Sequence, residues 1–163
     1  MKKQPIPGDG HPAMGTLVQQ HVRTQQGWQY LATVMDLYSR KIIGWSIQPN
    51  IKTTLIMDAL NMVLLQRKPN STTIIHSDRG VQYVSNSYQE LLEQHKLRCS
   101  MSGKGNCYDN APMESFYHTL KTEFMQDKPF QTKQQAANAI FDYIEVFYNR
   151  QRKHSALNYL SPT

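Results

Sequence analysis

The stretch Thr72-Thr-Ile-Ile-His76, followed by Ser77-Asp-Arg-Gly80, does most to decide the fold of this 163-residue chain. Its β-branched and apolar residues, ended by a glycine turn, are typical of a short buried strand. Amphipathic or capped helical patterns lie on both sides of it, over residues 53–67 and 85–95. Strands that alternate with helices imply a mixed sheet covered on both faces. The sequence therefore predicts an α/β fold.

Three strands are predicted before this stretch, over residues 17–23, 28–37 and 41–47, and turns at Gln25-Gln26-Gly27 and Ser39-Arg40 make them an antiparallel meander. After it, residues 97–101 form a last strand. One helix begins near Asn110 or Ala111 and ends before Pro129, and another spans residues 132–150. The expected order is βββαβαβαα, with a mixed five-stranded sheet flanked by helices. Residues 1–15, rich in Pro and Gly, form an irregular arm, and residues 16–163 form one domain.

The composition favours a polyanionic partner. The formal net charge is +6 and the pI is near 9.3, which suits nucleic acid but also fits an ordinary basic protein. No apolar run approaches the ~20 residues of a membrane span, and no signal peptide is recognisable. Cys99 and Cys107 lack zinc-binding spacing and indicate free thiols in a reducing compartment. A cytoplasmic protein without zinc is expected.

Two carboxylates are the candidate catalytic groups. Asp78 ends the buried strand, and Glu114 lies in the opening turn of a helix. Enzymes that cut and join phosphodiesters hold two divalent metals ~3.5–4 Å apart with acidic ligands placed in this way. Each residue also has a simpler interpretation, because Asp-x-Gly often forms a turn and a helix N-terminus favours any acid. A third carboxylate, which such sites usually take from an early strand, is missing.

Longer motifs surround these two acids. The chain closely resembles the integrase-type catalytic core of bacterial insertion-sequence transposases, relatives of retroviral integrase, from about Val22 to its end. The resemblance is carried by segments that are long and specific, namely Gly27-Trp28, Tyr30–Ala32, Asp36–Trp45, Ile75–Tyr83, Lys104–Phe116, Leu120–Glu123, Tyr148–Leu157 and Tyr159–Pro162.

The resemblance implies a ribonuclease H-like fold whose acidic triad binds Mg²⁺ or Mn²⁺. Such enzymes activate water, and then a DNA 3′-hydroxyl, for attack on phosphodiesters. Asp78 and Glu114 correspond to the second and third acids, and both are predicted to be catalytic metal ligands. Lys121 corresponds to a contact with donor DNA, although a solvated surface lysine is the simpler reading. Lys104 is predicted as a second DNA contact, through phosphate.

The first acid does not carry over. In the family it lies ten residues before the Gly-Trp tryptophan, and counting back from Trp28 gives Val18. Residues 16–22 match nothing in the family strand, so the hypothesis is that the upstream segment is read out of frame or has been replaced. Asp36 does not substitute for the missing acid. If Gln25-Gln26 is a two-residue turn, Val18 pairs with Thr33 and Asp36 lies on the other face. A three-residue loop leaves it ~7 Å along the strand.

These observations predict a DNA transposition and integration enzyme, a DDE-type polynucleotidyl transferase whose activity is impaired by Val18. The alternative is a non-catalytic remnant that binds DNA or self-associates. A ribonuclease H acting on RNA–DNA hybrids fits the fold but not the segment beginning Tyr148-Asn-Arg. The expected partners are transposon ends and target DNA, further copies of the chain, and a helix-turn-helix segment or chain that recognises the ends. Membrane association is not expected, and the bound form would be associated with the nucleoid.

Overall fold

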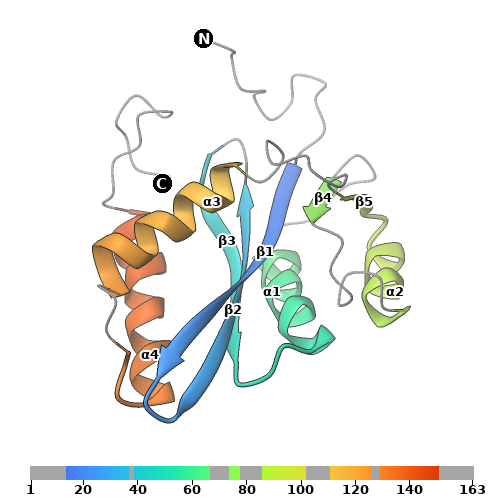
Figure 1. The fold of residues 1–163 in the computed structure, drawn as a ribbon. Coiled ribbons are helices and arrows are strands. Elements are labelled where there is room, and N and C mark those ends of the chain that lie inside the picture. Colours follow the sequence, from blue (N-terminus) through green and yellow to red (C-terminus); the bar gives the residue numbers. More distant parts are fainter. Residues whose placement is uncertain are drawn as a thin grey trace.

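A central sheet, with helices packed on both faces, organises the computed structural model of the chain (Figure 1). The structure describes residues 14–36, 39–66, 74–77, 86–101, 111–125 and 129–150. The sheet has five strands in the order β3-β2-β1-β4-β5. The strands are β1 (Met14–Thr24), β2 (Gly27–Asp36), β3 (Ile42–Gln48), β4 (Ile74–Ser77) and β5 (Arg98–Met101). The helices are α1 (Thr53–Gln66), α2 (Asn86–Gln94), α3 (Ala111–Thr119) and α4 (Lys133–Phe141), and two π-helical segments are η3 (Leu120–Met125) and η4 (Asp142–Tyr148).

The strand directions follow the expected plan. β1 pairs antiparallel with β2, and β2 with β3, so the predicted meander is confirmed. β4 lies parallel to both β1 and β5. Helix α1 connects β3 to β4, which lies on the other side of β1. Helix α2 connects β4 to β5, because parallel neighbours need a crossover connection of this kind. Strand β1 therefore lies at the centre of the sheet.

Strand β1 begins earlier than its sequence suggests. Met14 and Gly15 were predicted to end the irregular arm, but they pair with Ile74 and Ile75 of β4. Gly15 acts here as a strand residue between two close neighbours, because a side chain at this position would meet Ile75 and Val34 at 3.3 Å. The arm prediction was therefore wrong for these two residues. Residues 1–13 lie outside the described ranges.

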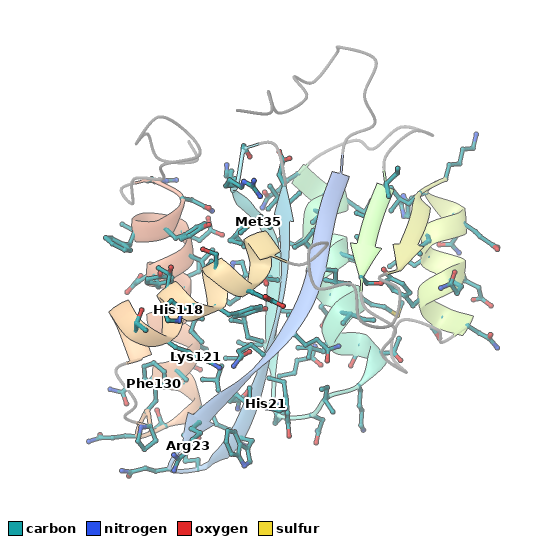
Figure 2. All side chains as sticks on the ribbon, turned by 45° about the horizontal axis from the view of Figure 1, so that its top comes forward. His21, Arg23, Met35, His118, Lys121 and Phe130 are labelled. Atoms are coloured by element: carbon teal, nitrogen blue, oxygen red, sulfur yellow. The ribbon has the colours of Figure 1, made fainter. Side chains whose placement is uncertain are left out.

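The β1–β2 hairpin has the two-residue turn that was considered first. Thr24 pairs with Gly27 and Val18 pairs with Thr33, so Gln25 and Gln26 form the turn. Gly27 has φ +116°, a value that favours glycine. Beyond the turn, Phe130 forms a bridge to Thr24, and its carbonyl accepts a hydrogen bond from Gln25 N at 2.8 Å. The segment that leads into α4 is thereby attached to the hairpin tip, near Arg23 (Figure 2).

Each face of the sheet carries its own buried cluster. On one face, α1 and α2 pack on residues such as Leu17, Ala32 and Val34. On the other, α3, η3, α4 and η4 pack on residues such as Val22, Leu31 and Met35. In Figure 1 α3 crosses in front of the sheet while α1 lies behind it. The sheet thus separates two cores, and α3 belongs to the second.

The two last helices end in π-helical turns, where a regular α-helix was expected. In η4 the amide of Asn149 donates to the carbonyl of Ile144, five residues earlier, at 3.1 Å. The wider turn ends at a tertiary contact: the Asn149 side chain accepts a hydrogen bond from Ile42 N at 2.9 Å and donates one to Ile42 O at 3.0 Å. Asn149 is 1% exposed. It therefore fastens the end of this helix to the edge strand β3.

Candidate active site

The centre of the site is the level of β1 at which the first acid was expected. Position 18 is occupied by valine and is paired with Thr33 of β2. Its neighbour Leu17 is paired with Ser77, the last residue of β4. Asp78 follows Ser77 directly in the chain but lies outside the described residues, as does Lys104. The described strands therefore bring position 18 next to the strand end from which Asp78 continues.

Helix α3 carries the other carboxylate. Glu114 lies in its first turn, as predicted, and is exposed. One turn later the hydroxyl of Tyr117 is hydrogen-bonded to Thr33 Oγ1 at 2.6 Å. Because Thr33 is the cross-strand partner of Val18, this bond holds the first turns of α3 at the level of position 18. Burial raises the pKa of Tyr117, and the hydrogen bond to Thr33 opposes the shift only in part.

Asp36 has a different role. It pairs with Gly15 and lies three residues from Thr33, which places it on the other face of the strand. Its carboxylate accepts a hydrogen bond from Ser39 Oγ at 3.1 Å, and its carbonyl accepts one from Arg40 N at 2.7 Å. Asp36 therefore closes the β2–β3 connection and does not replace the missing acid. Burial lowers the pKa of Arg40, and the nearby Tyr148 and Asp36 oppose this shift.

Two basic residues follow Glu114 on the solvent side of the helix. Lys121 is exposed in η3, seven residues after Glu114. His118 is also exposed, between them, and both are labelled on this helix in Figure 2. His118 was not predicted as a site residue, although its spacing of four residues from Glu114 was a usable signal. The exposed surface of α3 and η3 thus presents Glu114 followed by two side chains that can contact phosphate.

The available donors suit a hard divalent cation only in part. Carboxylate oxygens are the ligands that Mg²⁺ and Mn²⁺ prefer, and Asp78 and Glu114 would supply them. Val18 supplies none. Within the described ranges, no three His, Cys, Asp or Glu side chains gather into a metal-binding group. The donor set therefore fits one cation better than two.

Two further residues of the site were missed in the sequence. Thr33 and Tyr117 are 84 positions apart, and no local pattern links them. The only signal in the sequence was that Tyr117, three residues after Glu114, adds a polar hydroxyl to an otherwise apolar face of the helix.

None of the helices in the described ranges is long and apolar enough to cross a membrane.

The architecture defines the class of protein. An antiparallel meander followed by two parallel strands, with helices on both faces, is the ribonuclease H-like arrangement of integrase catalytic cores. The structure is similar to that of the catalytic core domain of HTLV-2 integrase, solved in complex with magnesium, with a TM-score of 0.67 and 16% identity over 94% of this chain and 95% of that one. It is also similar to a chain of the simian T-cell lymphotropic virus intasome in complex with PP2A regulatory subunit B56 gamma, with a TM-score of 0.73 and 14% identity over 93% of this chain and 53% of that one.

Sequence comparison identifies the family. The chain belongs to the integrase core domain family. One family profile described as an integrase core domain matches residues 16–107, and a second matches residues 114–163. Transposase InsF for insertion sequence IS3A, from Escherichia coli (strain K12), is 49% identical over 142 residues, which are 87% of this chain and 49% of that protein. An insertion element IS600 uncharacterized 31 kDa protein from Shigella sonnei is 46% identical over 87% of this chain and 52% of its own length. The chain spans about half the length of these relatives.

Proposed function

We propose that this chain is the catalytic core of a DDE-type transposase, and that its DNA-cutting and strand-transfer chemistry is impaired because Val18 stands in the place of the first acid. The observation that carries the proposal is the pairing of position 18. Val18 is paired with Thr33, and Thr33 is hydrogen-bonded to Tyr117 on the helix that carries Glu114. Leu17, directly before Val18, is paired with Ser77, the residue directly before Asp78. These contacts support a site in which Asp78 and Glu114 act together beside position 18.

In this proposal Asp78 and Glu114 would hold the cation, Mg²⁺ or Mn²⁺. When bound, such a cation lowers the pKa of a water ligand and stabilises the oxygens of an in-line displacement at phosphorus. The side chains of the protein bind and orient DNA. Lys121 and His118, exposed beyond Glu114, are suited to phosphate contacts that position the strand without reading its sequence, and Lys104 is a further proposed contact.

The missing acid limits this chemistry. A valine has no donor atom, so the second cation loses a ligand and the attacking oxygen loses an orienting group. Misplacement of reacting groups by about 1 Å can cost a factor of about 100 in rate. Very low nicking and strand transfer are therefore expected from the chain as it stands.

The test is a Mn²⁺ titration followed by thermal shift, with the unmodified chain beside Asp78→Asn and Val18→Asp. A cation present at about 100 times its Kd stabilises a fold by about 2.7 kcal/mol. For a domain of this size that is a rise in Tm of roughly 5–10 °C. We expect a small rise in the unmodified chain, none in Asp78→Asn and the full rise in Val18→Asp.

The outcomes separate this proposal from its alternative. A chain that responds to Mn²⁺ in none of the three forms has lost its metal site, and is then a non-catalytic remnant that binds DNA or associates with itself. The formal charge of +6 and the exposed Lys121 would still support DNA binding in that case. Robust strand transfer by the unmodified chain would contradict the impairment.

The remaining expectations concern partners and place. DNA is the proposed polyanionic partner, and assembly of several copies on DNA is proposed with it. The relatives are about twice as long as this chain, which leaves room in them for a separate segment that recognises transposon ends. A cytoplasmic location is also proposed, because Cys99 and Cys107 suit free thiols in a reducing compartment.

A further inference from the structure

One buried hydrogen bond joins α3 to the middle of the sheet. Tyr117 and Thr33 are buried among apolar residues of the second cluster, and their hydroxyl oxygens lie 2.6 Å apart. Phe116 beside Tyr117 is buried in the same apolar cluster, and its ring packs edge-on against Tyr148, with the ring centroids 4.8 Å apart. In so apolar a place a hydrogen bond is strong, and leaving one partner unmatched is costly.

The direction of this bond matters more than its strength. Apolar packing is non-directional, so the contacts of Phe116 and Leu120 alone would let the helix turn slightly about its axis. A hydroxyl pair keeps its hydrogen bond only within a few tenths of an ångström and a limited range of angles. The bond therefore fixes the rotation of α3 at Tyr117.

That rotation decides where the carboxylate of Glu114 lies. Glu114 precedes Tyr117 by three residues, a rise of about 4.5 Å along the helix. A carboxylate about 6 Å from the helix axis moves by about 2 Å when the helix turns by about 20°. Ligand distances at a metal site have to hold to about 0.2 Å. Even a small rotation would therefore carry Glu114 out of reach.

We propose that Tyr117 is a positioning residue for Glu114, acting through its hydrogen bond to Thr33, and that this bond sets the rotation of α3 at which Glu114 can serve as a ligand of the proposed divalent cation. The inference rests on the proposed function, since it requires Glu114 to be a metal ligand. The raised pKa of Tyr117 fits this role, because the hydroxyl keeps its proton at ordinary pH.

A purely structural role predicts a different behaviour, and a set of variants of the full chain separates the two. Tyr117→Phe and Thr33→Val each remove one hydroxyl while keeping the shape of the side chain. The double variant Thr33→Val/Tyr117→Phe removes both, which restores an apolar contact and should recover most of the stability. It does not restore a directional bond. Thr33→Ser keeps the hydroxyl, and Tyr143→Phe is a control on a second buried tyrosine of the same cluster, located on η4.

The measurements are the Kd for Mn²⁺, from the electron paramagnetic resonance signal of the free ion well below Tm, and the urea unfolding of the metal-free protein. We expect each single variant to lose stability and to bind Mn²⁺ about tenfold more weakly, the lower end of the range for residues that orient metal ligands. The double variant regains stability while its Mn²⁺ affinity stays about tenfold weaker. Thr33→Ser and Tyr143→Phe keep the affinity of the unmodified chain.

Two results would overturn the inference by itself. One is an unchanged Mn²⁺ affinity in both single variants, and the other is a double variant that recovers affinity together with stability. Glu114→Gln, measured in parallel, reports on the proposed function. If that variant binds Mn²⁺ as well as the unmodified chain, Glu114 is no ligand, and both the site assignment and the positioning role fail.

Discussion

On one face of the sheet, the described residues of α1 and α2 pack mainly through apolar side chains, whereas on the other α3 and η4 are also held by buried, directional hydrogen bonds. The hydrogen bonds between Gln48 on β3 and the side chains of Thr54 and Asp58 on α1 lie at the surface, in the first two turns of the helix. Across the sheet, Thr33 is bonded to Tyr117 and Asn149 to Ile42, both in buried surroundings. Apolar packing supplies free energy without fixing angles, while hydrogen bonds fix angles at little net gain. On the face that carries the candidate site, hydrogen bonds fix the orientation of the helices relative to the sheet.

Close packing on the α1 face can be broken at one glycine, and this should have the largest effect. A methyl group at Gly44 would overlap the carbonyl of Ala59 and the side chain of Val63, so α1 would have to move away from β3. We expect Gly44→Ala to lower the free energy of unfolding by about 3 kcal/mol, measured by urea denaturation. Gly15→Ala is the control, because its added methyl meets the side chains of Ile75 and Val34 at 3.3 Å and the nearest backbone atom, the carbonyl oxygen of Met35, only at 3.7 Å. Equal losses in both variants would contradict the argument.

On the other face, the two hydrogen bonds between the Asn149 side chain and the backbone of Ile42 can be removed by substitution. Asn149→Ala would leave the buried N–H and C=O of Ile42 without their partner. The expected loss is about 2 kcal/mol in the free energy of unfolding, which urea denaturation measures. Asn138→Ala serves as control, since Asn138 is exposed and its bond to Gln134 lies at the surface. A loss for Asn149→Ala no larger than that of the control would show that water replaces the side chain.

The smallest effect expected is a dependence on alkaline pH. Burial raises the pKa of Tyr117 in the folded chain, so between about pH 10, where an unfolded tyrosine ionises, and its higher folded pKa, only the unfolded state releases the proton. Stability is therefore full below about pH 10 and falls as the pH rises, by about 1 kcal/mol at pH 11. Unfolding of the unmodified chain and of Tyr117→Phe between pH 9 and 11 measures it. Parallel curves for the two chains would contradict it.

Local patterns in the sequence were sufficient for much of the fold. Alternation and turn residues predicted the strands to within a few residues, and the two-residue turn, once assumed, gave the pairing of Val18 with Thr33. Residues such as Leu55, Ile56 and Leu60 show the helical spacing that buries one side of α1. Residues close together in the chain determine these features, so the features can be predicted from the sequence.

Contacts between distant segments were not predictable in this way. The glycine at position 15 was read as part of a loop because its strand neighbours, Val34 and Ile75, are far away in sequence. The π-helical turn η4 ends at a contact between Ile42 and Asn149, which are 107 residues apart, and no local periodicity predicts this contact. Of the candidate site, the place of Glu114 in the first turn of a helix was correct, while the assignment of Val18 to the place of the first acid stays a prediction. The metal-binding and DNA-binding roles of Asp78, Glu114, Lys104 and Lys121 stay predictions.

Strand β3 is an outer strand of the sheet, and such a strand offers its free backbone groups to any other extended chain. At Ile42 those groups are already taken, since one amide side chain donates and accepts there as a neighbouring strand would. An intruding strand would have to displace Asn149 and leave a buried amide unmatched. The helix that carries Asn149 thus protects this end of the sheet against growth into larger β-aggregates, and one side chain makes both of the hydrogen bonds that do so.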